Sequence, residues 1–542
     1  MLGLMMDRPL LISQLIEYAA EYHGKTEIVS RSVEGPIHRY TYADSAKRAR
    51  KLANALKKLG VRLGDRVGTL GWNGYRHFEI YYAVSGSGAI CHTVNPRLFP
   101  DQISYIVNHA DDKFIFVDLN LVPILEAVQV HLKGVKGIVV MTDRAHMPQS
   151  KLSGLICYEE LIAPESEDFD WPDFDERTAS SLCYTSGTTG NPKGVLYSHR
   201  STLLHSYAVN LRGAFGLNQD DTVLPVVPMF HANAWGLPYA CPMVGAKMVF
   251  PGFKMDGASV FELLDGEGVT LSAGVPTVWL ELLRYCEQNH KKFSKLNRTL
   301  IGGSAVPRSM IERFDKEHGV FVIHGWGMTE MSPLGTATAF NRGEAELPKE
   351  QRYDLQAKQG RPIFGVQMRI LDDGGKELPK DGVAFGNLVV RGPWISSGYF
   401  KGEGTAAFTN DGWFHTGDVC TLNPQGYMTI TDRSKDVIKS GGEWISSIDL
   451  ENAAMAHPAV QEAAVIGIAH PRWDERPLLI IVRKPDAKVT REDLIKFFDG
   501  RVAKWWIPDD VAFVDQLPHT ATGKILKTKL REDFKSHKLP AA

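Results

Sequence analysis

Strand-like and helix-like segments alternate along most of this 542-residue chain, and that alternation restricts the folds open to it. Short β-branched or aromatic runs occur at residues 113–117 (KFIFV), 137–141 and 247–250. Segments with helical spacing separate such runs, for example residues 45–59 and 277–287. Periodicity that switches between that of a strand and that of a helix favours βαβ units and largely parallel sheets. We therefore expect an α/β fold.

The pattern changes near residue 364, where short strands are separated by Gly, Asp and Pro turns. Strands at 366–371, 386–391 and 427–431 indicate a small antiparallel or barrel-like region. Beyond Asp432 the pattern is α+β, with predicted helices and strands at 447–457, 462–468, 478–483 and 490–498. A chain of this length is too long for one hydrophobic core. We expect an N-terminal domain of residues 1–431 and a C-terminal domain of residues 432–542.

Composition excludes several classes of protein. The formal net charge of -2 provides no global field that would attract nucleic acid or an anionic membrane. Six scattered cysteines without a C-x-x-C pair indicate buried, reduced thiols of a cytosolic protein. Asp7 and Arg8 come too early for a signal peptide, and no stretch approaches the ~18 apolar residues of a membrane span. We expect a cytoplasmic protein without nucleic-acid partners or integral membrane contact.

Residues 184–194 (YTSGTTGNPKG) combine glycines, hydroxyls and one lysine in a short segment. Glycines allow a tight turn that directs several N–H groups at one anion, and hydroxyls and a lysine add donors and charge. Lys193 is followed by Gly194, so the segment is not a Walker loop. Either a solvated turn or a cradle for nucleotide phosphates fits this composition. The cradle would consist of Thr185, Ser186, Gly187, Thr188, Thr189, Gly190 and Lys193.

Two further clusters favour the cradle. In residues 299–305 (TLIGGSA), Gly302 and Gly303 follow a short apolar strand and would let a flat ligand lie against bare backbone. In residues 323–330 (IHGWGMTE), Trp326 between two glycines offers a ring face for a purine, and Glu330 offers a carboxylate for magnesium. A packing turn and an ordinary core aromatic are the alternatives.

Two clusters lie nearer the C-terminus. In residues 411–418 (DGWFHTGD), Asp418 can accept the hydroxyls of a ribose, although a capping role in a turn is common for such a residue. In residues 521–527 (ATGKILK), Lys524 taken alone is most simply a solvated lysine.

In this order, the five motifs resemble those of the adenylate-forming superfamily of acyl-CoA synthetases, luciferases and peptide-synthetase adenylation domains. The resemblance covers about residues 11–530 and includes residues 432–436 (DRSKD). Residues 227–235 (VPMFHANAW) and 439–446 (KSGGEWIS) are similar to the medium- and long-chain fatty-acyl-CoA synthetase branch. Within it, the chain most resembles the bacterial 3-methylthiopropionate-CoA ligases as a group.

The resemblance implies a large N-terminal domain of two α/β subdomains plus a β-barrel, and a small mobile α+β C-terminal domain. It implies a reaction in two halves. A carboxylate attacks the α-phosphorus of ATP and expels pyrophosphate, and the thiol of coenzyme A then attacks the acyl-adenylate and releases AMP. ATP, Mg²⁺, coenzyme A and a small carboxylic acid are the expected ligands, and a homodimer is the expected assembly.

The resemblance also assigns residues to the first half-reaction. Lys524 would supply positive charge at the α-phosphate, and Thr185 to Thr189 with Lys193 would hold the β- and γ-phosphates. Thr185 and Glu330 would contact magnesium. The remaining nucleotide contacts would come from Gly302, Gly303, Ser304, His324, Gly325, Trp326, Gly327, Met328, Thr329, Asp418 and Arg433.

For the second half, the C-terminal domain would rotate about Asp432, withdraw Lys524 and bring a glycine-rich segment to the site. Coenzyme A would then contact Lys439, Gly441, Gly442, Glu443 and Trp444, and Lys435 would be a further cofactor-binding residue. The acyl pocket would be formed by His231, Trp235, Gly302, Gly327, Met328 and Pro333. Trp235 is either a gate or a pocket wall, and His231 either helps to activate the thiol or has a structural role.

The acid expected is 3-methylthiopropionate or another short- or medium-chain acid, with a long-chain acid as the alternative. An enzyme that transfers its acyl-adenylate to a separate carrier protein is a second alternative. Because the sequence ends at Ala542, we expect no attached carrier domain. A non-catalytic nucleotide-binding protein is disfavoured, because Lys524, Glu330 and the phosphate segment are all present.

Overall fold

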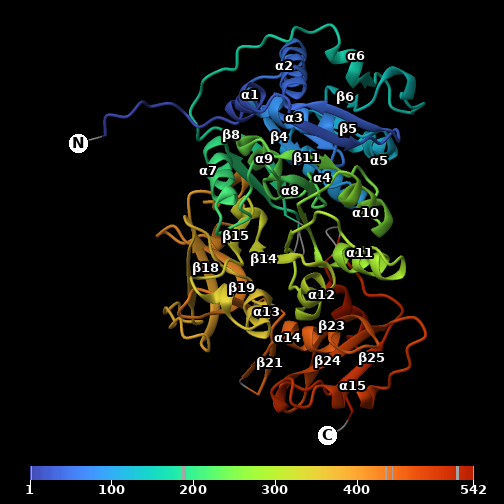
Figure 1. Ribbon diagram of the computed structural model, residues 1–542, viewed down its shortest axis with the longest axis vertical. Helices are drawn as coiled ribbons and strands as arrows, with labels where there is room; N and C mark the ends of the chain where they lie inside the picture. Colours follow the sequence, from blue (N-terminus) through green and yellow to red (C-terminus); the bar gives the residue numbers. More distant parts are fainter. Residues whose placement is uncertain (2, 186–190, 434–435, 442, 521–523, 541–542) are drawn as a thin grey trace.

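The computed structural model describes the chain except for residues 2, 186–190, 434–435, 442, 521–523 and 541–542. The described residues form two large sheets, one small antiparallel sheet and a separate C-terminal sheet (Figure 1). In Figure 1 the N-terminal sheet lies at the top, β18 and β19 at the lower left, and the C-terminal strands at the bottom. Within the described residues, no helix has the length and apolar character needed to cross a bilayer.

The first large sheet has seven strands, all parallel except for the antiparallel edge strand β9. Its strands, in spatial order, are β7 (Ile156–Cys157), β6 (Gly137–Val140), β5 (Asp112–Val117), β3 (Arg66–Leu70), β4 (Ile90–Thr93), β8 (Ala179–Tyr184) and β9 (Gly194–Ser198).

The second large sheet has nine strands, with a parallel centre from β1 to β14 and antiparallel strands at both edges. Its strands, in spatial order, are β16 (Arg361–Pro362), β15 (Leu334–Ala337), β14 (Phe321–Gly327), β13 (Arg298–Ile301), β12 (Leu271–Gly274), β10 (Thr222–Pro225), β11 (Lys247–Phe250), β1 (Glu27–Arg31) and β2 (Ile37–Thr41).

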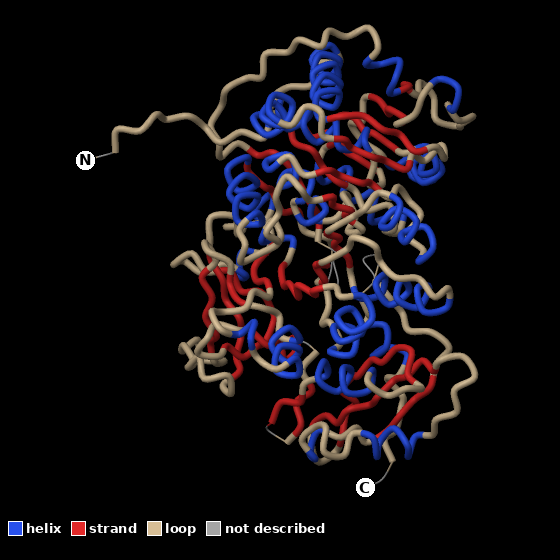
Figure 2. The backbone as a smooth tube through the Cα atoms, in the orientation of Figure 1, coloured by secondary structure: helices blue, strands red, loops and turns tan. Residues whose placement is uncertain are grey.

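Helices pack around and between the large sheets, as Figure 2 shows. Every residue of α3 (Tyr75–Gly86) is buried, and this helix contacts β4 and β8 of one sheet and β1 of the other. The other helices of this region are α1 (Ser13–Tyr22), α2 (Tyr42–Lys58), α4 (Pro100–Ala110), α5 (Val122–Val128), α6 (Tyr158–Ile162), α7 (His199–Asn210), α8 (Ala232–Trp235), α9 (Leu237–Val244), α10 (Gly257–Gly266), α11 (Pro276–Gln288), α12 (Arg308–His318) and α13 (Lys349–Ala357).

A capping box decides where helix α2 begins. The sequence predicts its start at Ser45, whereas the helix begins at Tyr42 because Thr41 caps it. The Thr41 hydroxyl accepts from the Asp44 amide at 3.3 Å, and the Asp44 carboxylate accepts from the Thr41 amide at 3.0 Å. This reciprocal pair satisfies two amide groups that would otherwise lack partners at the helix start. A capping box therefore overrides the start that apolar spacing indicated.

The barrel implied by the resemblance corresponds to an antiparallel sheet of β17 (Gln367–Leu371), β18 (Phe385–Arg391), β19 (Phe414–Leu422) and β20 (Met428–Arg433). Strand β20 ends one residue after Asp432, and the next strand belongs to the C-terminal sheet. That sheet contains β22 (Glu443–Ile445), β21 (Ile438–Ser440), β24 (Asp474–Arg483), β23 (Val460–His470) and β25 (Asp510–Phe513).

Helices α14 (Ser447–Met455), α15 (Arg491–Phe497) and α16 (Lys527–Asp533) accompany the C-terminal sheet. Alternate side chains of β23 and β24 enter two different hydrophobic clusters, one containing Val465 and Leu479 and the other containing Ile466 and Leu478. The sheet therefore has apolar packing on both faces. Together with the two large sheets, this arrangement confirms the expected α/β class with a small α+β C-terminal part.

Candidate active site

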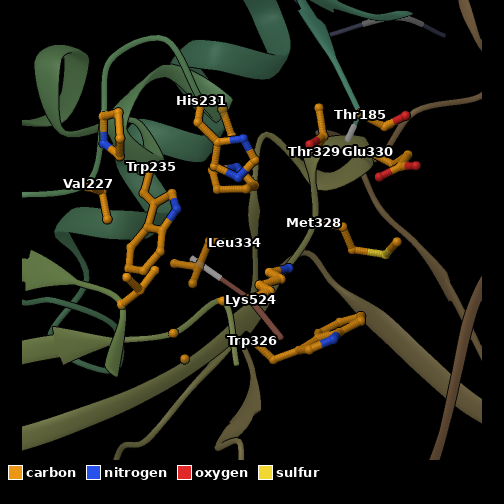
Figure 3. Close-up of a pocket in the computed structure, with 18 of the residues that line it drawn as sticks. Thr185, Val227, His231, Trp235, Trp326, Met328, Thr329, Glu330, Leu334 and Lys524 are labelled. Atoms are coloured by element: carbon orange, nitrogen blue, oxygen red, sulfur yellow. The ribbon is translucent and has the colours of Figure 1, made fainter. Parts of the chain in front are cut away.

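A cavity of about 330 Å³ lies beyond the carboxyl ends of four strands of the large sheets. Thr185 follows β8, Val275 follows β12, Gly302 follows β13 and Met328 follows β14, and all four residues line the cavity. Ligands of α/β sheets bind at such carboxyl ends, because the loops there converge. Figure 3 shows Trp235 beside Val227 on one side of the cavity, with Glu330 and Thr185 on the other. We call this space the catalytic cavity.

Glu330 is buried at the end of the catalytic cavity that also holds Thr185 and Lys193. One carboxylate oxygen accepts from the Tyr399 hydroxyl at 2.6 Å, and Lys193 lies 5.0 Å above the Tyr399 ring. Within the described residues, no group of three or more His, Cys, Asp or Glu side chains could hold a metal ion. Magnesium does not require such a cluster, since it binds through one or two carboxylates together with substrate phosphates. A single carboxylate beside the segment that the sequence predicts to bind phosphates fits that requirement.

Trp326 and Asp418 form a buried pair. The indole Nε1–H donates to Asp418 Oδ2 at 2.9 Å, and Asp418 Oδ1 lies 3.5 Å from Arg433 Nε. Glycine at 335 is required by this packing, because a Cβ there would lie 2.6 Å from the Trp326 ring. One carboxylate oxygen of Asp418 is therefore occupied by the indole, and the other faces a cation.

Lys524 enters the catalytic cavity from the C-terminal part of the chain. Figure 3 shows its side chain between Leu334, Met328 and Trp326. Its backbone is held by a reciprocal pair, in which Lys524 N donates to Thr520 Oγ1 at 3.1 Å and Thr520 N donates to Lys524 O at 2.6 Å. Burial, followed by the positive charge of Arg433, lowers the pKa of Lys524 to about 8.

The glycines at the cavity wall are required by close backbone contacts. A Cβ on Gly302 would lie 2.8 Å from the Gly325 carbonyl oxygen, and one on Gly327 would lie 2.0 Å from the Pro333 carbonyl oxygen. Gly303 has φ of +83°, which disfavours any residue with a side chain. The prediction of bare backbone at residues 302–303 agrees with this geometry.

His231 and Trp235 line the apolar end of the catalytic cavity with Phe215, Val227 and Met255. Burial, and secondarily the charge of Lys524, lowers the pKa of His231 to about 4. The imidazole is therefore neutral at pH 7 and is a weak base for a thiol whose pKa is ~8.5. This arrangement favours the structural alternative for His231 while Lys524 is present.

A second cavity of about 310 Å³ lies between α14 and the loop after β13, and shares Gly303, Trp326, Arg433 and Lys524 with the first. Ser304, His324, Asp418 and Asp432 line it. Burial lowers the pKa of His324 to about 4, and its Nδ1 lies 3.2 Å from the Gln356 carbonyl oxygen. The buried Nε2 atom has no hydrogen-bond partner among the described residues. It is an unused acceptor, which suits a ligand N–H group.

Asp432 is buried where β20 ends and contacts the C-terminal part of the chain. Its Oδ2 accepts from both the amide (3.0 Å) and the hydroxyl of Ser447 at the start of α14. Lys527 Nζ donates to the same Ser447 hydroxyl and lies 2.8 Å from Glu451 Oε1. Burial raises the pKa of Asp432, and the Lys527 charge opposes that shift.

Several predicted site residues are not brought to either cavity. Lys439 and Gly441 are exposed on the hairpin of β21 and β22, and neither residue lines either of the two cavities described above. Gly441 has φ of +61° and packs under Trp473, which explains the glycine there. The side chains of Glu443 and Trp444, and all of Ser186, Gly187, Thr188, Thr189, Gly190, Lys435 and Gly442, lie outside the part of the chain that the structure describes.

Sequence reasoning missed Tyr399, which binds Glu330 and stacks beside Lys193. It also missed Tyr197, whose hydroxyl donates to the Thr329 carbonyl oxygen at 2.6 Å. Each tyrosine is far along the sequence from the motif residue that it contacts, so no local sequence pattern could have identified either contact. Both contacts hold the loop that carries Thr329 and Glu330 in place.

Comparison with known proteins gives matches over nearly the whole chain. The model of the AMP-binding enzyme family matches residues 15–400, and that of the AMP-binding enzyme C-terminal domain matches residues 449–524. The 3-methylmercaptopropionyl-CoA ligase of Ruegeria lacuscaerulensis is 54% identical over 535 residues, covering 99% of each chain. The medium-chain-fatty-acid–CoA ligase of Ectopseudomonas oleovorans is 50% identical, covering 98% of each chain.

Among solved structures, the anthranilate CoA ligase AuaEII in complex with anthranoyl-AMP superposes with a TM-score of 0.87 at 26% identity. The match covers 98% of each chain. The sequence and structure comparisons therefore agree over the same extent of the chain.

Proposed function

The chain belongs to the AMP-binding enzyme family, and from that premise we propose that it is an AMP-forming acyl-CoA ligase for a short- or medium-chain carboxylic acid. The acid, ATP and coenzyme A are its substrates. Two similar proteins are named 3-methylmercaptopropionyl-CoA ligase. Our first candidate for the acid is therefore 3-methylthiopropionate, the thioether acid in that name.

One observation carries the proposal: Lys524 and Glu330 line the same cavity, although they belong to different parts of the chain. Attack of a carboxylate on the α-phosphate joins two anions, so the site must neutralise negative charge where the reacting atoms meet. Lys524 supplies that charge on the reacting side. Glu330 with Thr185 is suited to hold Mg²⁺ near the departing pyrophosphate. The acid needs no base, since it is ionised at neutral pH.

The size of the catalytic cavity supports a small acid. Its volume of about 330 Å³ is at the low end of the ~300–1,000 Å³ range for ligand pockets, and it must also hold part of the nucleotide. The indole of Trp235 contributes a wall at the apolar end. A long alkyl chain would require that wall to move.

The second half-reaction requires different groups at the acyl-adenylate. We propose that residues 432–542 rotate about Asp432, which withdraws Lys524 and brings the hairpin with Lys439 and Gly441 to the cavity. Withdrawal of Lys524 would also remove one cause of the low pKa of His231. A homodimer, a cytoplasmic location and bound Mg²⁺ stay predictions, as does the domain boundary near Asp432.

A substrate panel tests the proposal. AMP release would be measured with ATP, coenzyme A and straight-chain acids of increasing length, and with 3-methylthiopropionate. We expect the highest kcat/KM for 3-methylthiopropionate or for acids of at most about eight carbons. A maximum at fourteen to eighteen carbons would contradict the short-chain assignment. Adenylation without consumption of free coenzyme A would instead favour transfer to a carrier protein.

A further inference from the structure

The segment that carries Trp235 has an unusual backbone. Ala232, Asn233, Ala234 and Trp235 have φ of 43°, 51°, 50° and 56°, and Gly236 follows at 79°. L-residues with a Cβ rarely adopt this left-handed conformation, and consecutive examples are rarer still. The segment therefore forms one left-handed turn, which we call the Trp235 turn. Such strain persists only where surrounding contacts compensate for it.

Asn233 provides those contacts. Its side chain is buried and points away from the catalytic cavity, into the interface with the first large sheet. Nδ2 donates to Ser181 Oγ at 2.9 Å, and Oδ1 accepts from the Tyr81 hydroxyl at 3.3 Å and from Cys183 Sγ at 3.4 Å. Ser181 and Cys183 belong to β8, the strand that leads into Thr185. The three side-chain hydrogen bonds of Asn233 are thus directed at one strand, β8, and one buried helix, α3.

The backbone adds two further ties. Ala234 N lies 3.2 Å from both the Pro228 and His231 carbonyl oxygens. Tyr81 has one hydroxyl proton, which it shares between the Met229 carbonyl oxygen at 2.5 Å and Asn233 Oδ1 at 3.3 Å, so one hydroxyl contacts the residues before the turn as well as Asn233. Gly236 allows no side chain, because a Cβ would lie 2.7 Å from the His205 ring. The turn is held at its start, middle and end.

The consequence is the position of the indole. The Cη2 atom of Trp235 lies 3.4 Å from the place that a Cβ on Gly302 would occupy, and Cζ2 lies 4.0 Å from that on Gly303. The ring therefore abuts the glycine turn at the wall of the catalytic cavity. The backbone conformation of Trp235 sets the direction of its side chain. The position of the indole in the cavity therefore depends on the turn staying left-handed.

We propose that Asn233 is a positioning residue for acid length: by anchoring the Trp235 turn to β8, it holds the indole where it excludes acids longer than the preferred one. This inference rests on the proposed acyl-CoA ligase function. Asn233 does not line the catalytic cavity, and so acts through Trp235.

Asn233→Gly removes the side-chain hydrogen bonds that anchor the turn without adding backbone strain, because glycine adopts the left-handed conformation freely. We expect KM for the preferred acid to rise about 10-fold, kcat to change less than about 3-fold and KM for ATP to stay unchanged. The kcat/KM of an acid two carbons longer, relative to the preferred acid, should rise about 10-fold. Ser181→Ala removes the partner from the other side, and should shift the same ratio in the same direction by a smaller factor.

Ala234→Gly is the matched control, since it relieves backbone strain at the neighbouring residue and leaves the Asn233 hydrogen bonds intact. Its kcat/KM for the longer acid relative to the preferred acid should equal that of the wild type. An unchanged length ratio in both Asn233→Gly and Ser181→Ala would overturn the proposal, as would an equal loss for all acids. If Asn233→Gly does not fold, as judged by thermal melting, Ser181→Ala decides. A wild-type enzyme that activates no acid would instead contradict the proposed function itself.

Discussion

Replacement of Lys524 tests the chemistry most directly. Lys524→Ala removes the positive charge that enters the catalytic cavity near Glu330, Arg433 and Trp326. Loss of one preorganised charge or donor at a reacting centre costs ~10²–10³ in rate, which is ~2.7–4 kcal/mol. We therefore expect ATP–pyrophosphate exchange to fall by about 100-fold or more. The second half-reaction, measured with supplied acyl-adenylate and coenzyme A, should change less than about 3-fold, since in the proposed rotation Lys524 has left the cavity by then.

The pH dependence of wild-type activity is a second test of the role of Lys524. Burial and Arg433 lower the pKa of Lys524 to about 8, so the required ammonium form is lost as pH rises through that value. About nine-tenths of the enzyme carries the charge at pH 7 and about one-tenth at pH 9, so kcat/KM for ATP should fall roughly tenfold between them. Bound ATP brings negative charge that favours the ammonium, and the decline in kcat should therefore occur at higher pH.

Lys524→Arg is the matched control, because guanidinium stays charged over this range. The activity of Lys524→Arg should not decline above pH 8, even where the planar guanidinium group lowers its overall level below that of the wild type. The reasoning would be refuted if Lys524→Ala slowed both half-reactions equally, or if Lys524→Arg kept the wild-type pH profile. Melting temperatures near that of the wild type would show that neither variant acts through unfolding. For Lys524→Ala we expect no loss of stability, since this substitution removes a charge whose burial is unfavourable.

Three further predictions concern other contacts of the site. Glu330→Gln keeps an acceptor for Tyr399 but removes the carboxylate charge, and should raise the Mg²⁺ concentration needed for half-maximal exchange by at least about 10-fold; an unchanged Mg²⁺ titration would contradict the metal role. Trp326→Phe leaves the Asp418 carboxylate without its indole donor, and should lower the free energy of unfolding by ~1–3 kcal/mol and raise KM for ATP. Denaturant titration and ATP kinetics check both effects, and no change in either would contradict the buried pair. Asp432→Ala removes the acceptor of Ser447 at the hinge, and should slow thioester formation more than adenylation; equal slowing in the two assays would argue against a hinge role.

Local patterns predicted most of the fold. The helices and strands expected from periodicity are present with ends shifted by a few residues, as at Tyr42, where a capping box decides the start. The five motifs also predicted the contents of the catalytic cavity in large part. Thr329 and Glu330 lie on one loop, and Gly302 and Gly303 lie at one strand end, so each chemical group is encoded within a few residues.

The sequence by itself therefore determined the fold class, the family and the chemical groups of the site, because these depend on residues that are neighbours along the chain. Only the tertiary structure decided which motifs meet. The bond from Trp326 to Asp418 and the bond from Tyr399 to Glu330 join segments separated by 92 and 69 positions, and strand order brings them together. The Trp235 turn shows the limit most clearly. Local preference disfavours a left-handed conformation at four consecutive residues with side chains, and tertiary contacts, among them those of Asn233 with β8 and α3, compensate for it.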